Sequence, residues 1–141
     1  MKKVIKGGKV ATATDVFEAD LLIEDGVITQ IAKKIDVADA EVIDASGKYV
    51  MPGGIDPHTH LDMPFNNTVT DDDWESGTIA AAFGGTTTIL DFCLSAGETK
   101  LADAVAKWHT KAQGKAVIDY GFHLMITDFT PETEKELPII L

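Results

Sequence analysis

Arginine is absent from the sequence: all twelve basic residues are lysines, and they stand against 23 acidic residues, for a formal net charge of −11. Arginine supplies the bidentate contacts that favour phosphates and base edges, so this composition argues against a nucleic-acid partner. Cysteine occurs once, at Cys93, which excludes a disulfide within the chain and a cluster of thiolate metal ligands.

Long apolar stretches are also missing. No run approaches the roughly 18 residues that cross a bilayer, and the first lysines are not followed by the apolar segment of a secretory signal. We therefore expect a soluble, cytoplasmic protein that does not bind a membrane. The chain of 141 residues ends on "PIIL", with neither a C-cap glycine nor a polar tail, so we also expect it to be the N-terminal portion of a longer protein.

Residues 1–51 contain short apolar segments separated by tight turns. The segment "FEADLLIEDGVITQI" places Asp25-Gly26 between two apolar runs, which is the strongest short signal for a β-hairpin. The segment "EVIDASGKYVM" places Ser46-Gly47 in the same way and predicts a second hairpin. We expect a small antiparallel sheet that forms part of a β-sandwich.

Residues 52–141 show a different pattern, in which strands alternate with helices three times. Nearly continuous apolar strands between amphipathic helices indicate an α/β fold with a parallel sheet covered by helices. Three βα units form either an open sheet or the start of an eight-stranded TIM barrel, which takes about 250 residues. The predicted strands cover residues 54–60, 86–94 and 116–126, and the predicted helices cover 74–83, 99–112 and 131–141.

His58 and His60 end the first of these strands, in "PGGIDPHTHLDMPF". Residues i and i+2 of a strand point to the same face, so the two imidazoles are expected to project side by side. The carboxyl ends of parallel strands are where α/β folds place their chemistry, and two imidazoles there could reach one divalent ion. The alternative is that the two histidines lie in a turn, where they only cap the backbone or face solvent.

Three segments together resemble one family: "VMPGGIDPHTHLDMPF", "SGTIAAAFGGTTTILDF" and "GKAVIDYGFHLMI". The first is similar to the N-terminal metal motif of the amidohydrolase superfamily, and the set resembles its dihydropyrimidinase and hydantoinase group of cyclic amidohydrolases. The resemblance implies that residues 52–141 begin a metal-dependent TIM (β/α)8 barrel. It implies that residues 1–51 contribute antiparallel strands to a composite β-sandwich, and that the protein is a homo-oligomer, either a tetramer or a dimer.

The same resemblance implies that His58 and His60 bind one of two zinc ions, or of two ions of another divalent metal. The remaining ligands would be a carboxylated lysine, two histidines and an aspartate, all beyond residue 141. The aspartate would also carry the proton, so no catalytic residue is identifiable in this segment, and we expect residues 1–141 alone to be inactive. Met63 and Phe65, in the loop after the pair, would line the substrate pocket; ordinary loop packing is the alternative.

The activity implied is hydrolysis of the cyclic amide ring of hydantoins or 5,6-dihydropyrimidines, by a hydroxide held between the two metal ions. Dihydroorotases usually carry an arginine soon after the second histidine, and none follows His60 here. Two alternatives stay open: another cyclic amidohydrolase such as an allantoinase, and a non-enzymatic dihydropyrimidinase-related interaction protein. Relatives of the second kind typically lose metal-binding histidines, so the intact pair favours an enzyme.

Four further residues are of interest for the site. His123, within the third predicted strand, is expected to be a core histidine with a hydrogen-bond partner. Asp91, near the end of the second strand, is expected to bond to a loop or to support the metal site. His109 is expected to face solvent from its helix, and Cys93 to be a small buried hydrophobe, since no histidine or lysine flanks it.

Overall fold

The computed structural model describes residues 1–96 and 100–140. The chain divides into two compact units, Met1–Pro52 and Gly53–Leu141, which we call the N-terminal and C-terminal units. No helix in the described part of the chain is both long enough and apolar enough to cross a membrane.

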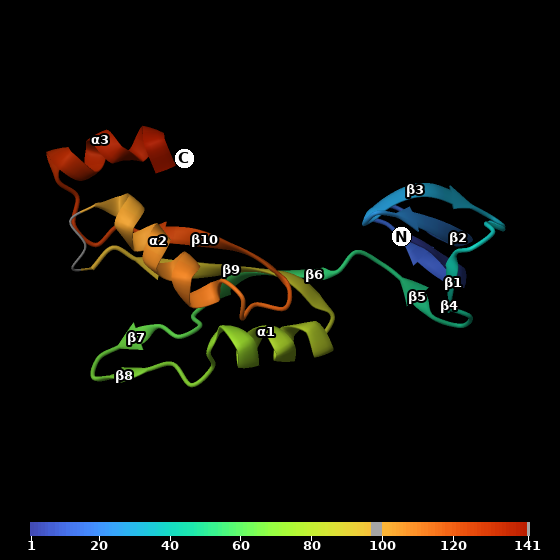
Figure 1. Cartoon of the computed structure of the whole chain (residues 1–141), viewed down its shortest axis with the longest axis horizontal. Helices are drawn as coiled ribbons and strands as arrows, with labels where there is room; N and C mark the ends of the chain where they lie inside the picture. Colours follow the sequence, from blue (N-terminus) through green and yellow to red (C-terminus); the bar gives the residue numbers. More distant parts are fainter. Residues whose placement is uncertain (97–99, 141) are drawn as a thin grey trace. The chain divides into compact units, whose positions relative to one another are not determined.

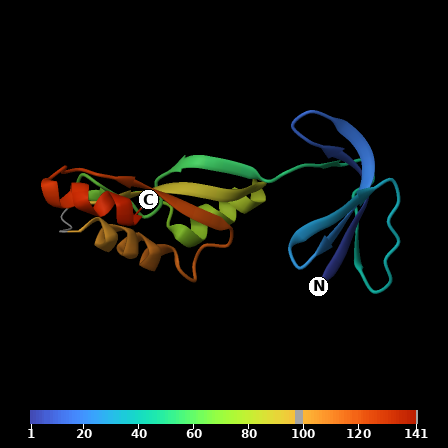
Figure 2. The same cartoon turned by 90° about the horizontal axis from the view of Figure 1, so that it is seen from above.

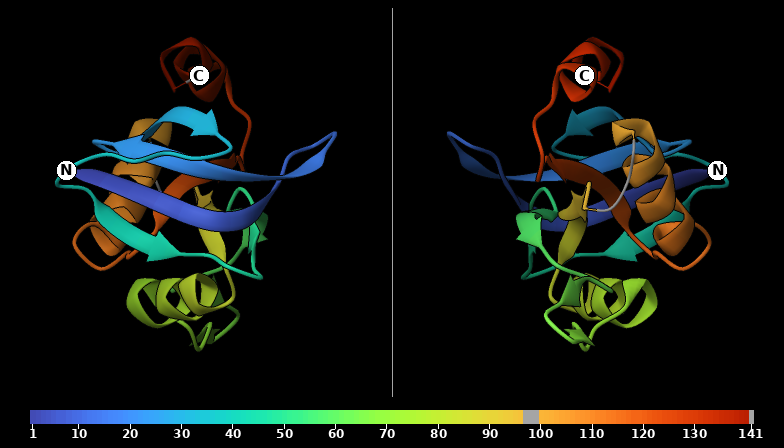
Figure 3. Two further views of the ribbon diagram at one scale, coloured as in Figure 1. Left: turned by 90° about the vertical axis from the view of Figure 1, so that its right-hand side faces the viewer. Right: turned by 90° about the vertical axis from the view of Figure 1, so that its left-hand side faces the viewer.

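The N-terminal unit is a five-stranded sheet in which β1 is central. Its strand order is β3-β2-β1-β4, and β5 also pairs with β1 (Figure 3, left). The strands are β1 (Lys2–Ala11), β2 (Val16–Glu24), β3 (Val27–Ala32), β4 (Glu41–Asp44) and β5 (Tyr49–Val50). The first predicted hairpin is confirmed: β2 and β3 are antiparallel, and Asp25 and Gly26 between them both have positive φ. Such a turn matches the twist of the strands it joins.

The second predicted hairpin is wrong. β4 and β5 do not pair with each other; each lies parallel to β1. The turn at Ser46-Gly47 instead returns the chain to β1, where Ala45 N donates to Lys6 O and Lys9 N donates to Lys48 O. The sheet is therefore mixed rather than antiparallel throughout, because bonds to a distant strand outcompete the local turn signal.

Asp20 stabilises this unit from within. The side chain is buried, and its two oxygens accept hydrogen bonds from Gly7 N and Ile35 N, both at 2.9 Å. These two bonds lower the pKa of Asp20 below its usual value. The carboxylate thus ties the irregular point of β1, where Gly7 has positive φ, to the segment after β3.

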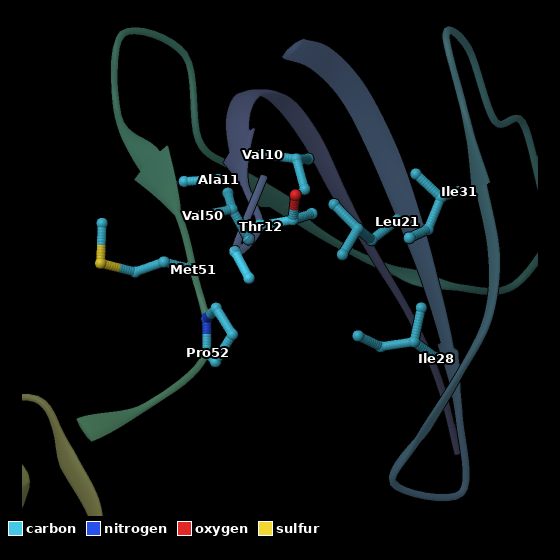
Figure 4. Close-up of a pocket in the computed structure, with 10 residues that line it drawn as sticks. Val10, Ala11, Thr12, Leu21, Ile28, Ile31, Val50, Met51 and Pro52 are labelled. Carbon is cyan, nitrogen blue, oxygen red and sulfur yellow. The ribbon is translucent and has the colours of Figure 1, made fainter. Parts of the chain in front are cut away.

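An apolar groove of about 330 Å³ lies within the N-terminal unit. Figure 4 shows its lining side chains, which come from the ends of β1 and β5, from the residues that follow these two strands, and from β2 and β3. Ile28 and Ile31 remain about half exposed at this surface. One apolar face of the sheet is therefore not covered by the described residues of its own unit.

The C-terminal unit is an α/β fold with a three-stranded parallel sheet of order β10-β9-β6 (Figure 1). Its elements in chain order are β6 (Gly54–Thr59), β7 (Pro64–Phe65), β8 (Thr68–Val69), α1 (Trp74–Phe83), β9 (Thr86–Leu94), α2 (Leu101–Ala112), β10 (Asp119–Met125) and α3 (Pro131–Ile140). The predicted elements over 74–83 and 86–94 coincide with α1 and β9. The predicted start of a helix at residue 99 and end of a helix at 141 lie outside the described residues.

Both α1 and α2 cover the same side of this sheet (Figure 2). Their tryptophans, Trp74 and Trp108, are buried against Ile89 and Cys93 of β9, with partly buried side chains of β10 packed around them. Asp73 caps α1 by accepting hydrogen bonds from two backbone N–H groups of its first turn. The opposite face of the sheet carries the histidines.

Candidate metal site

The site begins with a break in the register of β6. Asp56 pairs with Ile89 and Thr59 pairs with Asp91, so that Pro57 and His58 together face one residue of β9. Such a bulge re-aims side chains and is common beside active sites. It is held from two sides: Asp56 Oδ1 accepts from His58 N at 3.1 Å, and His123 Nε2 lies 3.0 Å from Pro57 O.

His58 and His60 converge at the end of this bulged strand. Their Nε2 atoms lie 3.2 Å apart, and their rings meet at 90° with centroids separated by 5.0 Å. Two nitrogens that each bind one tetrahedral zinc ion at 2.0–2.1 Å are about 3.3–3.4 Å apart. The pair therefore fits a single divalent ion, and the diverging side chains of a solvated turn pair are not observed.

Phe92 of β9 supports both imidazoles. Its ring centroid lies 4.6 Å from that of His58, 5.2 Å from that of His60 and 4.9 Å from that of His123. Sequence reasoning missed this residue. Phe92 is opposite His123 in the parallel register and so faces the same side, and that register is known only from the structure.

Asp91 holds the backbone around His60. Its side chain is completely buried, and Oδ2 accepts hydrogen bonds from Thr59 Oγ1 and Leu61 N, both at 2.8 Å. Burial raises the pKa of Asp91, and these hydrogen bonds and the His60 charge oppose that rise. The predicted bond from Asp91 to a loop is confirmed, and its place is immediately beside the histidine pair.

The loop after the pair is folded into a small hairpin of β7 and β8. Met63 closes its base, because Met63 N donates to Thr70 Oγ1 at 2.9 Å and Met63 O accepts from Thr70 N at 3.0 Å. Phe65 lies on β7 and is 62% exposed. Of the two predicted pocket residues, Met63 is thus a partly buried anchor and Phe65 an open side chain.

Lys111 connects α2 to this loop, and the sequence contained no signal for it. Its Nζ donates to Asp62 O, lies 3.4 Å from Asp62 Oδ2, and sits 4.8 Å from the ring centroid of Trp108. Asp62 has a positive φ of 48°, an uncommon conformation for a residue with a side chain. The lysine therefore stabilises a strained turn two residues after His60.

Three further predictions are settled by the structure. His123 has the expected hydrogen-bond partner but is exposed rather than in the core, because it faces the side of the sheet that the helices do not cover. His109 is exposed as expected and also packs edge-on against Phe122. Cys93 is buried as expected, and burial raises the pKa of its thiol.

No group of three or more His, Cys, Asp or Glu side chains that could hold a metal occurs within residues 1–96 and 100–140. The pair alone fits an ion, since two convergent imidazole nitrogens are a donor set that zinc accepts. Further ligands are needed to complete the coordination of an ion bound there.

A sequence model of the amidohydrolase family matches residues 41–123, and the chain belongs to that family. It is similar to the D-hydantoinase of Geobacillus stearothermophilus, with 64% identity over 141 residues, which are 100% of this chain and 30% of that protein. A crystal structure of a D-hydantoinase has a TM-score of 0.96 and 62% identity, over 99% of this chain and 30% of the other. The structure of dihydropyrimidinase from Brevibacillus agri has a TM-score of 0.94 and 57% identity, over 97% of this chain and 30% of the other.

The expected resemblance to hydantoinases and dihydropyrimidinases is therefore confirmed. The chain spans about 30% of the length of these relatives.

Proposed function

We propose that the protein is a divalent-metal-dependent hydrolase that opens the cyclic amide ring of hydantoins or 5,6-dihydropyrimidines. The observation that carries the proposal is the 3.2 Å separation of the His58 and His60 Nε2 atoms at a strand end. The similarity to proteins named D-hydantoinase and dihydropyrimidinase supports the choice of substrate.

His58 and His60 would hold one of two divalent ions, with zinc as the preferred metal for imidazole nitrogens. A carboxylated lysine, two histidines and an aspartate from outside this segment would complete the site, as the family resemblance implies. When bound, a pair of divalent ions supplies a nucleophile at neutral pH and polarises the carbonyl oxygen that is attacked.

The residues of this chain would orient the metal ligands and the substrate, and none of them would transfer a proton. The bulge of β6 directs both imidazoles to one point, and Phe92 restricts the rotation of their rings. Met63 and Phe65 would wall the pocket around the group on the substrate ring, with Met63 held by Thr70 and Phe65 open for contact. No general base is assigned within this segment, and residues 1–141 alone would be inactive.

The architecture of the whole protein belongs to the same proposal. Residues 52–141 would begin a TIM barrel, and residues 1–51 would be part of a composite β-sandwich. The exposed apolar groove of the N-terminal unit supports the second point, because further strands would bury it. A homo-oligomer, tetrameric or dimeric, in the cytoplasm is the assembly that the resemblance favours.

The test uses the full protein that the gene encodes. Zinc content and ring opening of hydantoin, dihydrouracil and allantoin are measured for the wild type, His58→Ala and His60→Ala, with His109→Ala as the control from an exposed helix position. We expect the rate of ring opening to fall by more than roughly 100-fold in His58→Ala and His60→Ala, which exceeds the usual effect of replacing a residue that only hydrogen-bonds to a metal ligand. Unchanged turnover in both histidine variants would refute the proposal. A preference for allantoin over hydantoin and dihydrouracil would keep the proposed reaction class but replace the proposed substrate.

A further inference from the structure

The peptide between Pro57 and His58 is held by two side chains instead of by the strand ladder. The register of β6 with β9 steps from Asp56 to Thr59, and proline has no N–H to offer a neighbouring strand. A bulge of this kind leaves its extra residue outside the ladder. The backbone just before the first histidine of the pair therefore takes its position from other bonds.

Each end of this peptide makes one such bond. His58 N donates to Asp56 Oδ1 at 3.1 Å, and Pro57 O lies 3.0 Å from His123 Nε2. A carbonyl oxygen can only accept, so His123 Nε2 carries a proton and is the donor. Because the peptide is trans, its O and its N–H point in opposite directions, and the two bonds hold it from opposite sides.

His123 makes its bond from a strand that does not pair with β6. In the sheet order β10-β9-β6, its side chain starts on β10 and reaches β6 across the central strand. Its ring packs against Phe92 of β9, the opposite residue in the register, with centroids 4.9 Å apart. The same phenyl ring lies 4.6 Å from the His58 ring, again between centroids. Phe92 therefore contacts both imidazoles that flank the bond to Pro57 O.

We propose that Asp56 and His123 are positioning residues for His58: their two hydrogen bonds fix the peptide unit from which its side chain projects. The Cα of His58 is one of the six atoms of that planar unit, so holding the unit places the imidazole. The Nε2 atoms of the pair are 3.2 Å apart, and ligating groups have to be held within about 0.5 Å of their productive geometry. This inference rests on the proposed metal site and deepens it, and neither residue is a metal ligand in this scheme.

The test is made on the full protein, because the face of the sheet that carries the histidines would be the interior of the proposed barrel. The dissociation constant for zinc is measured by competition with a chelator. His123→Leu removes the donor, and His123→Gln keeps an N–H group near the place of Nε2. We expect zinc to bind about 5–10-fold more weakly in His123→Leu, the effect of one hydrogen bond, and within about 2-fold of the wild type in His123→Gln. His109→Leu, which changes an exposed histidine that packs against Phe122, is the matched control and should also stay within about 2-fold.

Asp56 provides a second pair of variants for the other end of the peptide. Asp56→Asn keeps an oxygen that can accept from His58 N, whereas Asp56→Ala removes it. We expect zinc to bind about 5–10-fold more weakly in Asp56→Ala and within about 2-fold of the wild type in Asp56→Asn. The urea midpoint of the zinc-free protein is measured for every variant. A merely structural role would lower this midpoint and leave the dissociation constant unchanged, which would overturn the inference.

The remaining outcomes separate this inference from the proposed function. Zinc binding by the wild type that does not depend on His58 would overturn both. Zinc binding that depends on His58 but is unchanged in His123→Leu or in Asp56→Ala would overturn this inference alone. A loss in His123→Gln as large as that in His123→Leu would overturn it as well, because the donor is then not what matters. If His123→Leu does not fold, the comparison of Asp56→Ala with Asp56→Asn decides.

Discussion

Gly77 of α1 offers a substitution whose sign depends on tertiary packing. In an isolated helix interior, alanine is more favourable than glycine by about 1 kcal/mol. Here, a Cβ on residue 77 would lie 2.4 Å from Cδ2 and 3.2 Å from Cδ1 of Leu61. Both distances are shorter than an ordinary van der Waals contact, so Leu61 would have to move.

Leu61 has little freedom to move. Its side chain is buried in the cluster formed by Trp74, Ile89 and Trp108, and its backbone N–H is bound to Asp91. Extra volume in such a core typically costs about 1–3 kcal/mol. After subtracting the gain of about 1 kcal/mol in helix propensity, we expect Gly77→Ala to reduce the free energy of unfolding by about 0–2 kcal/mol.

Urea unfolding followed by tryptophan fluorescence measures this effect in the 141-residue chain. Both of its tryptophans, Trp74 and Trp108, are buried in the C-terminal unit, so the signal reports that unit. Gly84→Ala is the control: Gly84 has a negative φ of −80°, and its nearest neighbour to a new Cβ is at 3.4 Å. We expect it to change stability by less than about 0.5 kcal/mol.

Leu61→Val removes the two atoms that the new Cβ would strike. In that background, Gly77→Ala should be stabilising by about 0.5–1 kcal/mol, as helix propensity alone requires. The two substitutions should therefore show a coupling energy above roughly 0.5 kcal/mol. Equal stabilisation by Gly77→Ala in both backgrounds would refute the packing argument.

Three other predictions concern bonds that join distant segments. Asp20 has a lowered pKa in the folded state, so its contribution is present above the unfolded value near 3.9 and is lost as pH falls through the folded value. Asp20→Asn should abolish that part of the acid sensitivity and cost about 1–3 kcal/mol, measured by hydrogen exchange in the N-terminal unit; an unchanged acid profile would contradict this. Glu136 Oε2 accepts a hydrogen bond from Leu101 N at 2.6 Å, at the start of α2, where the N-cap residue makes no side-chain hydrogen bond. Glu136→Ala should therefore lower the free energy of unfolding by about 0.5–2 kcal/mol in the urea assay described above. An unchanged free energy of unfolding would show that this bond does not stabilise α2. Lys111→Met keeps the apolar part of the side chain but loses the hydrogen bond to Asp62 O. Amide hydrogen exchange of residues 62–72 should therefore become roughly 5–30-fold faster, while the exchange rates of residues outside this loop should stay unchanged.

Local patterns in the sequence determined most of the C-terminal unit. The alternation of apolar strand segments with helical segments predicted α1 and β9 at their observed bounds. The spacing of His58 and His60 predicted that their side chains share a face, because a strand repeats every two residues. The hairpin at Asp25-Gly26 was also predictable from adjacent residues, because an Asp-Gly pair favours the tight turn that joins two antiparallel strands.

Only the tertiary structure decided the partners of these elements. β4 and β5 lie parallel to β1 because their hydrogen bonds are made with residues far away in the chain, which the turn at Ser46-Gly47 does not reveal. His123 is exposed because the helices cover only the other face of its sheet. The same holds for the supports of the histidine pair. Phe92 and Lys111 are 30 or more residues beyond the groups they contact, and no local rule relates such positions before the sheet and its helices pack together. For Asp91 the sequence predicted a bond to a loop, and the structure identified its partners as Thr59 and Leu61.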